Sequence, residues 1–199
     1  MFEALGGSPA IIEIAKAILP PILTVTLAWL VGNRLTASWN LRQRQNEQAQ
    51  ARTDDFFRSY GELFSTWKAW NFLLDNKEET FALQKLELFK KSAASEGAME
   101  ALFVKLCAEL VLDDSELARL GCLRQAYQSL RQAIRSGSKL DWGSSENPQY
   151  LAFKRLSISV ASLLAIPRHT RETPTWIRAR KQLETVTSNQ WEAVWFKVE

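Results

Sequence analysis

The feature that most constrains this chain is the apolar stretch at residues 10–32, close to the N-terminus. Residues 17–32 hold no charge at all. A helix needs about 20 mostly apolar residues to cross the roughly 30 Å of hydrocarbon in a bilayer, and the residues before Ala17 extend the run to that length. Lys16 lies near the edge of this window, where its aliphatic stem can reach the interface. We therefore predict one transmembrane helix at residues 10–32.

Two alternatives remain for this stretch. A cleaved secretory signal has a basic cluster before its apolar run, whereas Glu3 and Glu13 stand there in this chain. The other alternative is a buried core helix broken at Pro20 and Pro21, although uncharged runs of this length exceed most core segments. Because each proline lacks an N–H and crowds the carbonyl four residues before it, we expect a kink in the helix.

Charges on the two sides of the stretch predict its orientation. One set of arginines follows it and only Lys16, beside two glutamates, precedes it; the arginines are Arg34, Arg42, Arg44 and Arg52. Cytoplasmic flanks of membrane helices carry an excess of Lys and Arg. We therefore expect residues 1–9 as a short exterior N-terminus, and the C-terminal part of the chain in the cytoplasm.

Four residues of the stretch are candidates for a function at the membrane edge: Glu13, Lys16, Pro20 and Pro21. An ionisable group inside hydrocarbon usually marks a pore, a relay or a paired partner. Alternatively the span starts at Ile14, and Glu13 lies among the headgroups and pairs with Lys16, three residues on.

The rest of the chain predicts an all-α fold, because apolar residues recur at spacings of three and four. Residues 33–53 are polar, contain no Gly or Pro, and are expected to form a helical stalk. Residues 54–199 are expected to form the cytoplasmic helical bundle. Within it we expect a helix to end near Lys91, a break at residues 92–97, and a further helix beyond. Acidic residues at 113–116 and Asn147-Pro148 are typical of helix starts.

Aromatic residues suggest where a partner could bind. An apolar seam that includes Trp67 and Trp70 runs along residues 56–74, and Trp191 and Trp195 share one face near the C-terminus. These four tryptophans are candidate partner-binding residues, although a broad apolar seam is also typical of a helix facing a core. Trp142, in a turn-rich loop, is either a plug on the bundle or an exposed contact.

Basic residues are densest between Lys154 and Lys181, around Trp176. The candidates for contact with an anion are Arg168, Arg171, Arg178, Arg180 and Lys181. Point charges and stacking on tryptophan could serve such a contact, while a solvated helix face is the ordinary alternative. The net charge of +3 does not by itself indicate a nucleic-acid partner.

No motif for catalysis, cofactor binding or metal binding is present. The chain lacks a Gly-rich phosphate loop, a GxSxG elbow, an HExxH pair and a CxxC pair. Its one histidine, His169, cannot build the usual histidine metal sites, and Cys107 and Cys122 fit small core positions. We expect no enzyme activity, no cofactor and no metal.

These features predict a single-pass membrane protein whose cytoplasmic domain is a non-catalytic interaction or sensory module. Its expected partners are the lipid bilayer and either another protein or further copies of the chain. The alternative is a membrane-perturbing effector, of the toxin or defence type, whose spans assemble and breach the bilayer. In that case the residues at the membrane edge would line or gate the opening.

Overall fold

The computed structural model describes residues 9–76, 79–140, 142, 146–166 and 173–197, with side chains from Pro20 onward. All regular elements in these ranges are helices, so the predicted all-α class is confirmed. The chain divides into two compact units, Met1–Gln45 and Asn46–Glu199, and the division falls inside helix α1 (Pro9–Asp75). We refer to Asn46–Glu199 as the bundle.

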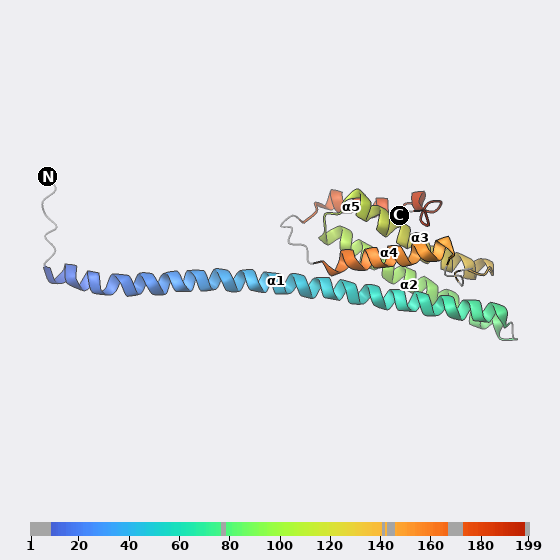
Figure 1. The fold of residues 1–199 in the computed structure, drawn as a ribbon, viewed down its shortest axis with the longest axis horizontal. Helices are drawn as coiled ribbons and strands as arrows, with labels where there is room; N and C mark the ends of the chain where they lie inside the picture. Colours follow the sequence, from blue (N-terminus) through green and yellow to red (C-terminus); the bar gives the residue numbers. More distant parts are fainter. Residues whose placement is uncertain (1–8, 77–78, 141, 143–145, 167–172, 198–199) are drawn as a thin grey trace. The chain divides into compact units, whose positions relative to one another are not determined.

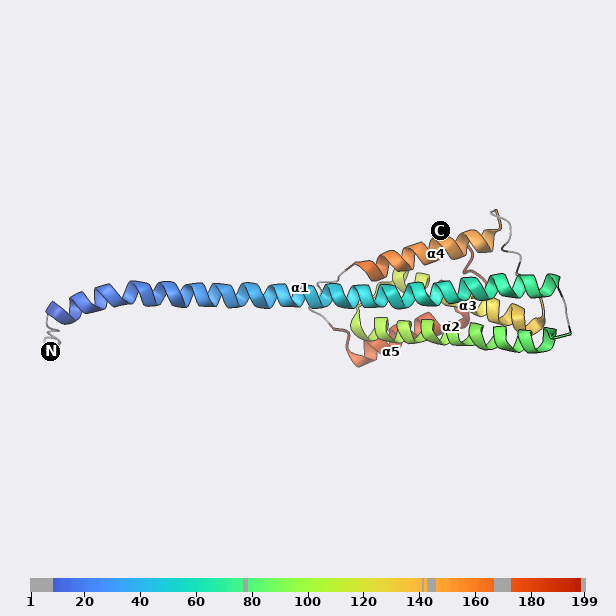
Figure 2. The same cartoon turned by 90° about the horizontal axis from the view of Figure 1, so that it is seen from below.

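The bundle contains residues 46–75 of α1 and the remaining helices (Figure 1). These are α2 (Phe81–Glu109), α3 (Asp114–Ser136), α4 (Pro148–Ala165), α5 (Trp176–Thr187) and the short 3-10 helix η1 (Asn189–Trp191). Figure 2, turned by a quarter from Figure 1, shows α2 and α4 on either side of the bundle part of α1. Helix α3 contacts α2, α4 and α5, and is therefore the most central of the shorter helices.

The helix ends follow local sequence signals. At the start of α3 the Asp113 carboxylate accepts from the Glu116 N–H, and the Glu116 carboxylate accepts from the Asp113 N–H, at 2.9 Å each. This is a capping box, which satisfies two backbone donors that a helix start leaves free. Gly137, with φ of 75°, ends α3 in the left-handed conformation that glycine adopts without steric cost. Asn147 caps α4 ahead of Pro148, as the sequence predicts.

Aromatic side chains fill the core of the bundle. The Trp142 indole stacks on Phe153 with ring centroids 5.1 Å apart and lies 5.5 Å from the Trp67 ring. The Trp70 indole donates to the Ser138 carbonyl at 2.8 Å, so its polar N–H is satisfied. The C-terminal segment contributes Trp195, which is 3% exposed and faces Trp142. Trp142 is thus a plug on the bundle and not an exposed contact.

Polar contacts also join the helices of the bundle. Arg52, placed by the sequence in the stalk, is buried and pairs with Glu109 of α2 at 3.3 Å. Arg131 of α3 pairs with the buried carboxylate of Glu96 at 2.6 Å. Of the four arginines from which the orientation was predicted, Arg34, Arg42 and Arg44 are exposed and Arg52 is buried. The orientation argument therefore depends on these three.

One expected element boundary is wrong. The break predicted at residues 92–97 does not exist, because α2 is continuous from Phe81 to Glu109. Ser92 and Ser95, which suggested the break, are both buried in the helix. The Ser95 hydroxyl donates to the Ser59 carbonyl of α1 at 3.0 Å, so these small polar residues serve a close contact between helices.

The described helices do not add support for the predicted transmembrane helix. Helix α1 passes through Pro20 and Pro21 without interruption. Within the residues that the structure describes, no helix combines enough length with enough apolar character to cross a bilayer. The transmembrane character of residues 10–32 stays a prediction.

Candidate functional site

The apolar residues of α1 in the first unit are exposed. Leu23, Leu27 and Leu30 have 52%, 59% and 46% of their surface accessible. The other large apolar side chains that are exposed between Pro20 and Gly32 are Ile22, Val25, Trp29 and Val31. Because each residue of a helix turns by about 100°, these side chains surround the helix and do not form one stripe. A helix that is apolar all round belongs in a core or a membrane.

Threonine hydroxyls within this segment are satisfied by the helix itself. Thr24 donates to the Pro20 carbonyl at 2.8 Å, and Thr26 donates to the Ile22 carbonyl at 2.7 Å. Each polar side chain therefore has a hydrogen bond that needs no water. In an apolar environment a polar group must form its hydrogen bonds within the protein, as these two hydroxyls do.

The four candidates at the membrane edge fall in α1, but only two can be described in full. Pro20 and Pro21 are exposed. Glu13 and Lys16 lie in the helical backbone of α1, and their side chains are outside the described residues. The predicted role of these two charges stays a prediction.

The four candidate partner-binding tryptophans are used inside the bundle. Trp67 and Trp70 are 1% and 0% exposed. Trp191 is half-buried, and its indole N–H donates to the Thr185 carbonyl at 2.8 Å. Trp195, as described above, is in the core. The surface available to a partner is therefore formed by other residues.

The basic candidates are partly described. Arg178, Arg180 and Lys181 are exposed on the first turns of α5, whereas Arg168, Arg171 and His169 lie outside the described residues. Arg180 lies 3.3 Å from Glu184 and over the ring of Trp176, with 5.4 Å between guanidinium carbon and ring centroid. The exposed Trp176 ring thus has a cation from its own helix.

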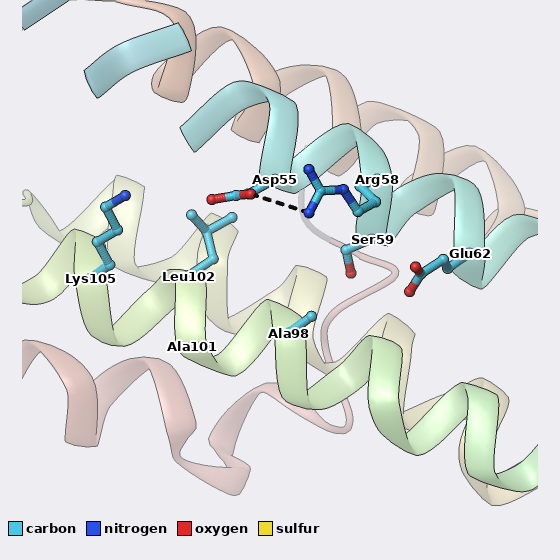
Figure 3. Close-up of a pocket in the computed structure, with 8 residues that line it drawn as sticks. All are labelled: Asp55, Arg58, Ser59, Glu62, Ala98, Ala101, Leu102 and Lys105. Atoms are coloured by element: carbon cyan, nitrogen blue, oxygen red, sulfur yellow. Dashed lines mark ion pairs between the residues drawn. The ribbon is translucent and has the colours of Figure 1, made fainter. Parts of the chain in front are cut away.

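A groove between α1 and α2 is the surface feature that the sequence did not reveal. Its first part is a hollow of about 300 Å³. Figure 3 shows Asp55, Arg58 and Glu62 of α1 on one side of this hollow, and Ala98, Ala101 and Lys105 of α2 on the other. A second hollow of about 320 Å³ shares Glu62 and is also lined by Ser65, Thr66, Lys91 and Ala94. We call the two hollows together the α1–α2 groove.

A hydrogen bond joins the two helices next to the first hollow. The hydroxyl of Ser59, which lines this hollow, donates to the Ser95 carbonyl of α2 at 3.1 Å. The only ion pair within the described groove residues joins Asp55 and Arg58 of α1 at 3.8 Å, and both side chains are more than half exposed. Such an exposed pair contributes at most about 1 kcal/mol, so the groove charges remain available to a partner.

The described residues support neither a reactive thiol nor a metal site. Burial raises the pKa of the Cys107 and Cys122 thiols to about 11, which keeps both protonated and weakly reactive near neutral pH. Across the described ranges, no group of three or more His, Cys, Asp or Glu side chains is placed to hold a metal ion.

Comparisons with protein families, with curated proteins and with solved structures found no match to this chain. The argument for function therefore depends on the residues and their geometry.

Proposed function

We propose that the chain is a membrane-anchored interaction module. Helix α1 holds it in the bilayer through residues 10–32, and the bundle acts without catalysis on the cytoplasmic side. The observation that carries this proposal is the set of exposed apolar side chains around α1 between Ile22 and Val31.

The arrangement of these side chains favours a lipid environment for this part of α1. Burial of an exposed leucine contributes about 1.5–3 kcal/mol, so leaving seven large apolar side chains in water is unfavourable. The internal hydrogen bonds of Thr24 and Thr26 remove the main polar penalty of transfer. The uncharged run of residues 17–32 covers about 24 Å at 1.5 Å per residue. The proposed anchor therefore uses residues before Ala17, with Lys16 extended to the interface.

The bundle supports a role in interaction. The aromatic residues Trp67, Trp70 and Trp142 are packed in its core, while the α1–α2 groove offers an exposed surface with charges of both signs. An anchor confines such a surface to the membrane and raises its effective concentration toward partners there. The exposed Arg34, Arg42 and Arg44 support a cytoplasmic location for the bundle.

Membrane retention tests the anchor. We expect the full chain to stay in the membrane fraction after alkaline carbonate and to leave it in detergent. Leu27→Arg introduces a charge near the middle of the proposed span, at a cost of about 2.5–3.5 kcal/mol, and should shift the chain toward the extractable fraction.

Leu41→Arg is the matched control, because Leu41 is an equally exposed leucine of α1 (58%, against 59% for Leu27) outside the proposed span. It should be retained like the unaltered chain. Extraction of the unaltered chain by carbonate alone would refute the proposal, as would equal behaviour of the two variants.

A further inference from the structure

The two walls of the α1–α2 groove carry opposite charges. The α1 wall presents the carboxylates of Asp55 and Glu62, and the α2 wall presents the ammonium groups of Lys91 and Lys105. Figure 3 shows Asp55 and Lys105 on opposite sides of the same hollow. Arg58 is the exception on the α1 wall, and it is the partner of Asp55. A partner that fits this groove must present a basic wall opposite α1 and an acidic wall opposite α2.

Small residues in the groove allow another helix to come close. Ala94, Ala98 and Ala101 line it on α2, and all three are exposed. Because alanine has no side-chain atom beyond Cβ, the backbone of a partner helix can approach α2 closely along this face.

We infer that the α1–α2 groove binds the same groove of a second copy of this chain. A twofold axis along the groove places α1 of each copy against α2 of its partner. Asp55 then faces Lys105 of the other copy, and Glu62 faces the region of Lys91, twice by symmetry. The same surface thus supplies both the acidic and the basic wall, as an interface with twofold symmetry requires.

This inference rests on the proposed anchor in one respect. An anchor would confine two copies to the same membrane with the same orientation and so raise their effective concentration toward each other. A helical protein with an acidic and a basic edge is the competing occupant, and the test separates it from a second copy.

The test compares two variants of the full chain in the membrane. Ala98→Leu places a bulky side chain in the groove lining on α2, and Gly61→Leu does so on α1 at a glycine that lies outside the groove lining. Both positions are exposed, so both variants should fold. Chemical cross-linking and sedimentation in detergent measure the dimer. We expect Ala98→Leu to weaken dimerisation by about tenfold or more, because the larger side chain fills the space that the partner's α1 would occupy, and Gly61→Leu to leave it unchanged.

Exchanging the charges of Asp55 and Lys105 provides a second test of the dimer. Asp55→Lys alone and Lys105→Glu alone should each weaken the dimer, and the chain with both changes should recover it, because the opposite charges are restored across the axis. A monomeric unaltered chain, a dimer insensitive to Ala98→Leu, or a double variant that stays weak would overturn the inference. Stoichiometric capture of a different protein by the groove would also overturn it.

Membrane retention, measured on the same samples, keeps the two proposals apart. A chain that is retained by the membrane yet monomeric refutes the dimer alone. A chain that carbonate extracts refutes the anchor.

Discussion

Replacing Gly121 by alanine should destabilise the bundle, although alanine is the better helix former. Gly121 is buried in α3, and a Cβ built there would overlap the indole ring of Trp191. That indole is fixed by its hydrogen bond to the Thr185 carbonyl near the end of α5. Because Gly121 has no side chain, the Trp191 indole has room to pack on α3, and the C-terminal segment docks there.

The expected magnitude follows from three opposing terms. Alanine gains about 1 kcal/mol of helix propensity over glycine. Overpacking a filled site costs about 1–3 kcal/mol, and moving the indole away from Thr185 gives up about 0.5–1.5 kcal/mol of hydrogen bonding. The net result is a loss of roughly 2 kcal/mol in the free energy of unfolding.

Urea unfolding of the full chain in detergent, followed by tryptophan fluorescence, measures this loss. Gly61→Ala and Gly97→Ala are matched controls on exposed helix faces, where a Cβ meets nothing within 4 Å. Each should stabilise the bundle by up to about 1 kcal/mol. In addition, Gly121→Ala combined with Trp191→Ala should lose less than the sum of the two single changes. The reasoning fails if Gly121→Ala behaves like the controls.

Three further predictions concern two substitutions and the native cysteines. Gln182→Leu should lower the free energy of unfolding by about 3 kcal/mol, because the Gln182 amide donates to the Cys107 and Leu110 carbonyls and accepts from the Leu112 N–H at 2.9–3.0 Å; unfolding in urea measures it, and an unchanged midpoint contradicts it. Cys107 and Cys122, whose pKa values burial raises to about 11, should resist iodoacetamide until the chain unfolds. Because the folded state keeps both thiols protonated, the free energy of unfolding should fall as the pH rises from about 8.5, the pKa of a free thiol, to about 11. Labelling of the folded chain by iodoacetamide at pH 8 would contradict the expected protection of the thiols. Asp113→Ala should cost about 1 kcal/mol through loss of the capping box. The Glu116 N–H and the Ser115 hydroxyl lower the pKa of Asp113, so its contribution is present above the ordinary carboxyl pKa of about 3.9 and disappears as the pH falls through the lowered value. The difference between Asp113→Ala and the unaltered chain should therefore narrow in acid, and a constant difference argues against the cap.

Local signals were enough to predict most helix ends and the apolar seam of α1, but they left open whether the seam faces the core or a partner. Asp113 and Asn147 cap the helices that they were expected to start, because capping depends on residues within one turn. Trp67 and Trp70 are buried as the spacing of the aromatic seam allows.

The remaining features of the fold depend on contacts between residues that are far apart in the sequence. Ser92 and Ser95 favour a break when read locally, but both are buried in α2, and Ser95 and Ser59 of α1 exchange hydrogen bonds. The incorrect break also concealed the groove. Lys91 and Lys105 fall on one face only when α2 is continuous, since fourteen residues make about four turns. Their position opposite Asp55 and Glu62 depends on which faces of α1 and α2 pack together, and no local pattern encodes this.

Labelling from each side of the membrane tests the central claim most directly. Leu5→Cys and Gln45→Cys place single reactive thiols before and after the proposed anchor, while the buried native cysteines stay unreactive. In sealed cells a membrane-impermeant maleimide should label the Leu5→Cys variant and leave the Gln45→Cys variant unlabelled, and inside-out vesicles should give the reverse. Equal labelling of both variants from the same side would contradict an anchor that crosses the bilayer.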